Sequence, residues 1–464
     1  MLTKLGEKFT DLFKKNMPDA FVFAIILTFI AAGAAIITTN ASLLDVIGSW
    51  YQGFWMLLEF GMQMVLLIIT GYSIALSPLA EKGINGLTGH IKTPKQVYFV
   101  TVLLGILLGL ISWGWIIITA LFARELAKRV EGVNYAFLIA CVYFSMSGWV
   151  TGFSSSIPLL LNTPNNYLID AGLLSDIIPT SYTLGSGLNI AMIVLFIVVT
   201  PILMVFLISR LGKGKSLQEL SDNYSEYEKP ILEEANDQKL REFALSDKLN
   251  NSWILTWLIG LSGLVYIIRH FLLFGFDLNL NIMIFIFLML GMLLHKTPIR
   301  YGISMKRSSA NVSGILFQFP FYAGIMGIMI HTGLGEHLST WLASVATIDN
   351  YPFFAFLSGA IVNFAIPSAG GEFAVIGPSV IEAVQSIGSG LPDEEVTKMI
   401  SRAAMSMAYG ESLTNALQPF FLLLVLPIMG SGVRIQARDI MGYLVIPFLL
   451  YFVIQSTMVV LWPL

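Results

Sequence analysis

The stretch NFAIPSAGGE, residues 363–372, lies between apolar runs at 353–361 and 373–380. It contains a proline, a serine and two adjacent glycines, a composition that suits neither a helix interior nor a buried strand. Inside a bilayer, non-helical backbone is tolerated only where protein buries it or where it lines a wet cavity, because unpaired N–H and C=O groups are costly there. We therefore predict a chain break at membrane depth here, and with it a candidate binding site.

The composition places the whole chain in a membrane. Of 464 residues, 56% are hydrophobic and 12% are charged, whereas soluble domains carry about 25% charged residues. The net charge of −3 gives no basic face for nucleic acid. The single cysteine, Cys141, excludes an internal disulfide and a cysteine metal cluster.

Segments of about 20 mostly apolar residues predict the membrane spans. Lys and Arg in short loops mark the cytoplasmic side, so the loop with Lys92 is expected inside and the loop with Asp349 outside. The fold class is therefore an all-α polytopic membrane protein. About nine spans are predicted, at 19–38, 54–77, 135–163, 187–208, 253–274, 279–295, 311–332, 403–430 and 440–461.

Each of two further apolar segments, 97–127 and 351–390, has charged residues of the same sign at both ends. Lys95 and Arg124 flank the first, and acidic residues such as Asp349 and Asp393 flank the second. Flanks on the same side of the membrane predict two re-entrant hairpins, the first entering from inside and the second from outside.

The order span, span, hairpin, broken span, span occurs twice, in 19–210 and in 278–464. The first copy starts inside and the second outside, so we predict an inverted repeat with the connecting span 251–277 between the copies. This is a common layout of secondary transporters. Residues 1–18 are expected to form an amphipathic cytoplasmic helix and 211–250 a charged cytoplasmic linker, and the C-terminus is expected outside.

Four interruptions supply the candidate substrate site. They are Ser112 to Gly114 and Pro367 to Glu372 in the two hairpins, SGWVTGFSSSIP (147–158) in the broken span 135–163 and YGESLTNALQP (409–419) in the broken span 403–430. The apolar cores of these segments hold no Lys or Arg, so backbone N–H groups at half-helix ends and hydroxyls would bind an anion. The alternative is that the small residues only let helices pack closely. The candidates are Ser112, Trp113, Gly114, Ser154, Ser155, Ser156, Pro367, Ser368, Gly370 and Gly371.

Ionisable and amide side chains near the second pair of breaks are candidates for a coupling-ion site. An acidic residue such as Glu411 within a span is functional by default, although it could instead brace its helix through Asn415. Glu372 is similar but could face the outside water. With Asn363, these residues would serve a proton or a Na⁺ at the hairpin tips; we expect no other metal and no organic cofactor.

Two other function classes fit less well. A channel needs a continuous polar or charged pore lining, which the uncharged hairpins do not offer. A hydrolase needs a nucleophile with a base in reach, and no histidine lies at the membrane depth of Ser154 to Ser156. We therefore expect a transporter and not an enzyme.

Several ordered motifs resemble those of the bacterial short-chain fatty acid transporter family, within the ion-transporter superfamily. They are FGMQM (60–64), ARELAKRV (123–130), GFSSSIPLL (152–160), LLHKTP (293–298), QFPFYAGI (318–325), NFAIPSAGGE (363–372) and AYGES (408–412). The resemblance implies symport of butyrate or acetoacetate into bacteria across the inner membrane, by an elevator-like homodimer coupled to H⁺ or Na⁺. Another small organic anion is the alternative substrate, and an anion channel the weaker alternative.

Overall fold

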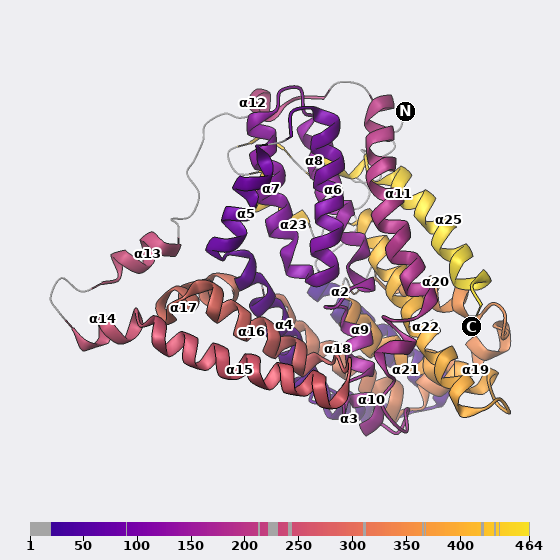
Figure 1. Ribbon diagram of the computed structural model, residues 1–464. Helices are drawn as coiled ribbons and strands as arrows, with labels where there is room; N and C mark the ends of the chain where they lie inside the picture. The colour runs from indigo at the N-terminus through magenta and orange to yellow at the C-terminus, as the bar shows by residue number, and fades with distance from the viewer. Residues whose placement is uncertain are drawn as a thin grey trace.

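The computed structural model is helical in the residues that it describes, with no β-strand among them (Figure 1). This confirms the all-α prediction. The described residues are 20–89, 91–211, 214–220, 231–239, 244–309, 312–363, 366, 368–418, 422–430, 433–435 and 437–463. The amphipathic helix predicted at 1–18 lies outside them.

The first half of the chain forms long helices joined by short capped turns. Thr93 and Gln96 form a capping box at the start of one of them, with Pro94 in its first turn. The helices are α2 (Ala20–Thr39), α3 (Leu43–Gly53), α4 (Leu58–Ala75), α5 (Pro78–Thr88), α6 (Pro94–Ile111), α7 (Ile116–Arg129), α8 (Tyr135–Ser145), α9 (Ser156–Leu161), α10 (Tyr167–Asp170) and α11 (Gly187–Leu211).

The charged linker contains short helices, and the second half again consists of long ones. The linker helices are α12 (Leu217–Leu220), α13 (Ile231–Asp237) and α14 (Leu245–Asn250), followed by α15 (Trp253–Phe274). The second half contains α16 (Leu280–His295), α17 (Pro298–Ser309), α18 (Ser313–His331), α19 (Leu334–Val345), α20 (Tyr351–Val362), α21 (Ala369–Ile387), α22 (Asp393–Thr414), α23 (Leu422–Met429), α24 (Ala437–Met441) and α25 (Val445–Leu461).

Five helical segments of the described chain are long and apolar enough to cross a membrane, fewer than the nine spans predicted. They are Leu58–Ala75, Pro94–Ile111, Tyr135–Leu161, Gly187–Ser209 and Leu245–Phe274. Most other predicted spans correspond to shorter apolar helices, at Ala24–Thr39, Leu280–His295, Leu316–His331 and Val445–Leu461. Tyr351–Val362, in the second predicted hairpin, is also of this shorter kind.

The two predicted hairpins appear as pairs of helices with a break between them. In the first half α6 packs against α7 and α8, and Figure 1 shows the three side by side at the top. In the second half α20 packs along α22, where glycines bring the two backbones together. A Cβ at Gly410 would lie 2.0 Å from the Phe356 carbonyl oxygen, and one at Gly359 would lie 2.3 Å from that of Met407.

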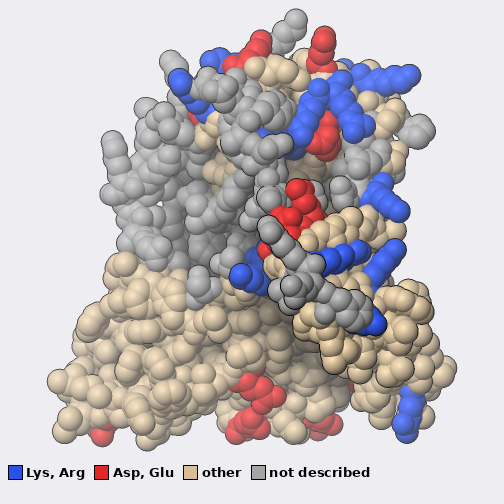
Figure 2. All heavy atoms as spheres, turned by 90° about the vertical axis from the view of Figure 1, so that its left-hand side faces the viewer, with Lys and Arg blue, Asp and Glu red and all other residues tan. Residues whose placement is uncertain are grey.

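Charge is unevenly distributed over the face that lies at the left of Figure 1. Figure 2 shows a broad uncharged band in the lower half of this face, acidic side chains along its lower edge, and most of the Lys and Arg above it. Exposed apolar residues of α15, such as Leu258 and Val265, have no covering protein. An uncharged band bounded by charged side chains is what a protein surface in contact with a bilayer requires.

The second half differs from expectation in two places. Helix α22 begins at Asp393 rather than 403, because Asp393, Glu394 and Glu395 form its first turn, where acidic groups stabilise the helix dipole. The sequence pattern predicts these acids only as a flank of the second hairpin. The same helix continues through Glu411 to Thr414, so the break begins later than the predicted 409–419.

Candidate functional site

The first hairpin tip is a sharp break between α6 and α7. Helix α6 ends at Ile111, the next residue, Ser112, has an extended backbone (φ −152°), and a 3-10 turn follows at Trp113–Trp115. The Trp113 N–H donates a hydrogen bond to Ser154 Oγ at 2.9 Å. The Phe153 N–H donates to the Leu110 carbonyl at 2.6 Å. The tip of the first hairpin is therefore joined directly to the break in the span that follows it.

Helix α4 supports the other side of this tip. The Trp115 indole N–H donates to the Gly71 carbonyl at 2.9 Å. A Cβ at Gly71 would lie 2.5 Å from Ser112 Oγ, and one at Gly114 would lie 3.2 Å from the Tyr72 backbone nitrogen. Ser112 and Gly114 are thus packed against α4.

The first broken span has three buried serines at its break. Helix α8 ends at Ser145, a 3-10 turn covers Met146–Thr151, and α9 resumes at Ser156. Ser154 bonds the hairpin tip, whereas the hydroxyls of Ser155 and Ser156 are buried without a partner among the described residues. Unpartnered buried hydroxyls are unusual in native structures, and these are available to a ligand.

The second broken span is held by a cluster of amide side chains. Asn363, at the end of α20, directs its Nδ2 to the carbonyl oxygen of Glu411 (2.9 Å), Thr414 Oγ1 (2.8 Å) and Asn415 Oδ1 (3.0 Å). Gln418 Nε2 donates to Asn415 Oδ1 at 2.8 Å and to the Asn363 carbonyl at 3.3 Å. The second hairpin is therefore tied to the break that follows it, as the first is.

Contacts between the two halves converge on Asn415. The Tyr143 hydroxyl, from α8, donates to the carbonyl oxygens of Asn415 (2.8 Å) and Gln418 (2.9 Å). The Ser412 hydroxyl donates to the Ser147 carbonyl at 2.8 Å. Both broken spans thus meet at one point in the protein interior.

A small cavity lies at this meeting point. Its volume is about 20 Å³, and a single water needs about 10–15 Å³. Trp113 and Trp149, with ring centroids 6.5 Å apart, form part of its wall. The other lining residues are Ile116, Tyr143, Met146, Ser147, Ser412, Asn415 and Ala416. The first hairpin tip and both broken spans therefore share one enclosed space.

The second hairpin tip lies against other elements. Ser368 caps α21 by accepting the Gly371 N–H at 3.4 Å. Gly370 packs on Phe60 and Gly371 on Tyr322, in α4 and α18. None of these three candidates lines the cavity at Asn415, and Pro367 lies outside the described residues.

Two buried carboxyl groups lie near the amide cluster. Glu372, in α21, and Glu411, in α22, are each 1% exposed, and these two helices pack against each other. Glu411 Oε1 accepts a hydrogen bond from Asn415 Nδ2 at 3.2 Å. The Oε2 atoms of both glutamates and Asn363 Oδ1 are buried without a partner among the described residues. The burial of Glu372 argues against its predicted alternative of facing the outside water.

The predicted coupling-ion residues are therefore neighbours in space. The pair of carboxyl groups and the Asn363 amide oxygen are acceptors that suit a proton or a hard cation. The part of the chain that the structure describes holds no group of three or more His, Cys, Asp or Glu side chains placed to bind a metal ion.

Sequence reasoning missed three polar residues of this site: Tyr143, Ser147 and Ser412. All three lie in or beside the predicted breaks at 147–158 and 409–419. The sequence indicated both breaks, but nothing in it showed that they would pair through Tyr143 and Ser412.

Comparison with known proteins identifies the family. A family model described as short chain fatty acid transporter matches residues 1–462. A protein of Escherichia coli is 37% identical over 446 residues, and one of Haemophilus influenzae is 36% identical over 450, with 96% of each chain covered. Their names assign them, provisionally, to short-chain fatty acid transport. The chain belongs to the short-chain fatty acid transporter family. Membership confirms the predicted family and the expectation of a transporter rather than an enzyme.

Solved structures show that this short-chain fatty acid transporter family member has a transporter fold. The Alcanivorax borkumensis YdaH transporter matches with a TM-score of 0.60 at 14% identity, over 96% of this chain and 98% of that one. Neisseria gonorrhoeae MtrF, from a class of antimetabolite efflux pumps, matches with a TM-score of 0.58 at 14% identity, over 96% of both chains. At this identity the likeness concerns the fold alone.

Proposed function

We propose that this family member is a secondary transporter that imports short-chain monocarboxylates, such as butyrate and acetoacetate, across a bacterial inner membrane. The observation that carries the proposal is the convergence on Asn415 of both broken spans and the first hairpin tip, around a cavity without a basic side chain. Such convergence of broken helices is where transporters bind substrate. Membership of the short-chain fatty acid transporter family supports this choice of substrate class.

In this proposal backbone N–H groups and hydroxyls hold the carboxylate. Trp113 and Trp149 line the cavity, and their indoles would contact the acyl chain. Ser112, Gly114 and Ser154 to Ser156 lie outside its lining and would offer donors once the first tip moves, as would the Trp113 N–H, which now bonds Ser154 Oγ. The cavity of about 20 Å³ cannot admit a carboxylate with its chain, so the first tip must move to let substrate in. Pro367, Ser368, Gly370 and Gly371 would reach the substrate when the second tip moves.

Transport is coupled to H⁺ or Na⁺ at Glu372, Glu411, Asn363 and Asn415. The support is the set of buried oxygens of Glu372, Glu411 and Asn363 that have no partner among the described residues. A proton bound between the two carboxyl groups, or a Na⁺ bound by the same oxygens, would neutralise their mutual repulsion. Substrate and cation then move in the same direction, which is symport.

The remaining architecture follows the inverted-repeat interpretation. The helix pairs α6–α7 and α20–α21 are re-entrant hairpins, the N-terminus is cytoplasmic and the C-terminus outside. The homodimer works by elevator-like movement of the hairpins and broken spans. The charge distribution in Figure 2 supports this orientation, because basic residues mark the cytoplasmic side. A cysteine at Asn350 would be labelled from outside and one at Lys92 from inside; the reverse labelling would overturn the orientation.

Uptake of radiolabelled butyrate and acetoacetate into proteoliposomes tests the function. Na⁺ and proton gradients are imposed separately, and we expect saturable uptake that one of them drives. A current that rises without saturation would instead support an anion channel. If succinate or another organic anion is taken up and butyrate is not, the alternative substrate class is correct.

A further inference from the structure

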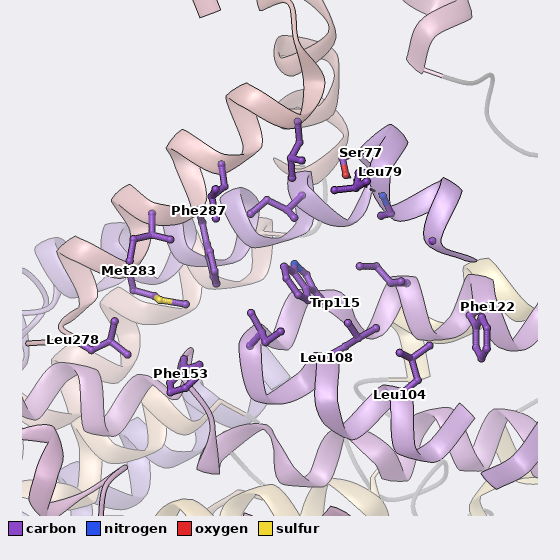
Figure 3. Close-up of a pocket in the computed structure, with 18 of the residues that line it drawn as sticks. Ser77, Leu79, Leu104, Leu108, Trp115, Phe122, Phe153, Leu278, Met283 and Phe287 are labelled. Carbon is purple, nitrogen blue, oxygen red and sulfur yellow. Dashed lines mark hydrogen bonds between the residues drawn. The ribbon is translucent and has the colours of Figure 1, made fainter. Parts of the chain in front are cut away.

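An apolar crevice of about 540 Å³ lies apart from the cavity at Asn415. One wall comes from the first hairpin, α6 and α7, with Phe153 from the adjoining break, and the other from α4, α5, α15 and α16. In Figure 3, Leu108 and Trp115 lie across the crevice from Met283 and Phe287. The crevice therefore separates the first hairpin from the long helices α15 and α16.

The lining suits hydrocarbon and offers nothing to a carboxylate. Among the described residues that line the crevice, Ser77 and Trp115 are the ones with a side-chain nitrogen or oxygen atom. The Trp115 N–H already donates to the Gly71 carbonyl. Its volume is within the range of about 300–1,000 Å³ of ordinary ligand sites, but a charged group inside it would have no partner. Its occupant must keep its polar end outside.

Two cations lie beside one end of the crevice. Lys82 directly precedes Gly83, which lines it, and Lys296 follows the lining residue Leu294 by two positions. Both lysines are exposed. Basic side chains at a membrane surface attract anionic lipid headgroups. Apolar residues of the lining are also open to the surroundings, since Leu79 is 62% and Phe153 46% exposed.

We propose that this crevice binds one acyl chain of an anionic phospholipid, whose headgroup lies near Lys82 and Lys296. The lipid contacts the first hairpin and α15–α16 at once. Its binding therefore depends on how these two parts are placed, and a bound lipid stabilises the arrangement seen in this structure. The crevice is separate from the proposed substrate cavity, so the lipid proposal does not depend on which substrate is transported.

Neighbouring leucines of α6 provide a matched test. Leu108 lines the crevice, whereas Leu107 is 42% exposed and does not. The protein and its variants are purified in mild detergent, incubated with phosphatidylglycerol, and weighed by native mass spectrometry. We expect one retained phosphatidylglycerol in the wild type and in Leu107→Trp. In Leu108→Trp we expect about tenfold lower occupancy, because the indole overfills the crevice.

A second filling variant and a spectroscopic measurement guard against misfolding of Leu108→Trp. Leu290→Trp fills the crevice from α16 and should lose the lipid as well. In vesicles of phosphatidylglycerol with brominated acyl chains, Trp115 should be quenched, so Trp115→Phe should lower the quenched share of the fluorescence. Lys82→Gln with Lys296→Gln should remove the preference for phosphatidylglycerol over phosphatidylcholine.

Three results would overturn the proposal. The first is equal lipid retention in Leu107→Trp, Leu108→Trp and Leu290→Trp. The second is a quenched fraction that Trp115→Phe leaves unchanged. The third is a retained free fatty acid in place of a phospholipid. None of these measurements involves uptake, so a failure here is distinguishable from a failure of the proposed transport.

Discussion

The two hairpin tips have similar topology and different chemistry. The first tip, Ser112 to Trp115, is uncharged and is joined to its broken span through main-chain groups and Ser154. Beside the second tip lie Glu372 and Glu411, two buried carboxyl groups, and the Asn363 amide. Two breaks of similar layout can therefore differ in what they could bind. In the proposed function the first tip serves mainly the substrate and the second mainly the coupling ion.

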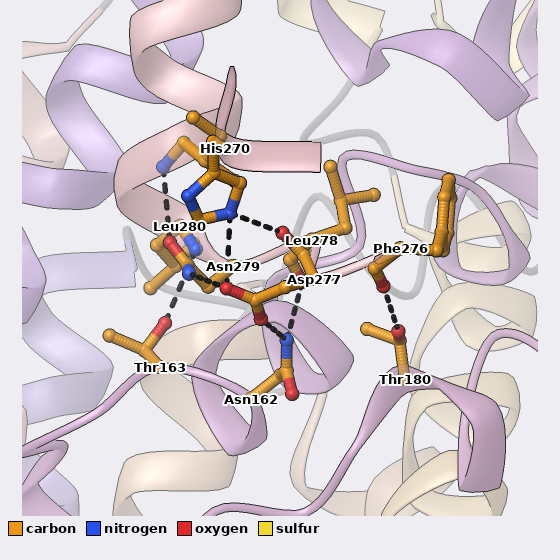
Figure 4. Close-up of polar contacts among 10 residues, drawn as sticks. Asn162, Thr163, Thr180, His270, Phe276, Asp277, Leu278, Asn279 and Leu280 are labelled. Carbon is orange, nitrogen blue, oxygen red and sulfur yellow. Dashed lines mark hydrogen bonds and ion pairs between the residues drawn. The ribbon is translucent and has the colours of Figure 1, made fainter. Parts of the chain in front are cut away.

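The two breaks also differ in what ties them to the rest of the protein. Asp277, in the loop between α15 and α16, accepts hydrogen bonds from Asn162 (2.7 Å) and Asn279 (3.2 Å) and pairs with His270 at 3.1 Å (Figure 4). Asn162 follows α9 and also donates to the Leu278 carbonyl at 3.1 Å. The first break is thus linked to the loop that leads into α16. The amide network of the second break instead joins α20 to α22, and the second tip packs on side chains of α4 and α18.

We expect the largest effect from replacing Glu411, one of the two buried glutamates near the second tip. Glu411→Gln keeps the acceptor that Asn415 uses but cannot carry a proton or a negative charge. If the tips differ as proposed, gradient-driven uptake in proteoliposomes should fall about 100-fold, as expected for loss of a charged contact of about 3 kcal/mol. Ser154→Ala, at the break joined to the first tip, should weaken the affinity for the substrate and leave the dependence of uptake on the coupling ion unchanged.

Glu59→Gln serves as the control for this experiment. Glu59 is an exposed residue in the first turn of α4, so its substitution should leave uptake unaltered. Uptake by Glu411→Gln with wild-type dependence on pH and Na⁺ would remove Glu411 from the coupling role.

The next effect concerns movement of the first break. In a Cys141→Ala background, Asn162→Cys and Asp277→Cys are joined by a short bifunctional thiol reagent. We expect uptake to stop, because α9 would be fixed to the loop before α16, and to return when the reagent is removed by reduction. Asp277→Cys with Asn279→Cys joins two positions of one loop and should leave uptake intact. Full uptake in the cross-linked 162–277 protein would mean that this break does not move.

The sequence predicted the breaks better than their partners. Proline, glycine and serine inside apolar runs are a local signal, so interruptions near Ser112, Gly152 and Ser368 could be predicted without a structure. The pairing of Tyr143 with the Asn415 carbonyl joins residues 272 positions apart, and nothing local encodes it. The continuation of α22 to Thr414 was missed because glycine and serine in YGES suggested a break, whereas close packing of Gly410 on α20 favours helix there.

A third experiment compares the glycines of the two halves. A Cβ at Gly152 would lie 2.2 Å from the Leu110 carbonyl oxygen, whereas one at Gly371 would meet the Tyr322 ring at 3.0 Å. Main-chain atoms cannot move away as a ring can, so Gly152→Ala should lower the free energy of unfolding by about 1–3 kcal/mol and Gly371→Ala by less. Thermal unfolding in detergent measures both. Equal losses of unfolding free energy would mean that the first break, at Gly152, and the second tip, at Gly371, are equally rigid.

The smallest effect is expected at the start of helix α22, where Lys398 and Glu394 form an exposed ion pair at 2.7 Å. The hydrogen bond from Lys398 lowers the pKa of Glu394, so any stabilisation is present above the ordinary glutamate pKa and is lost as the pH falls through the lowered value. Solvent and salt screen such a pair more than they screen the partly buried contacts of Asp277, between α15 and α16. Lys398→Gln should therefore shift the unfolding temperature by less than about 2 °C at pH 7, and by less still at a pH below the lowered pKa of Glu394, where the carboxyl group is protonated. A larger shift at pH 7 that 1 M salt does not remove would show that the start of α22 is held as firmly as the loop around Asp277.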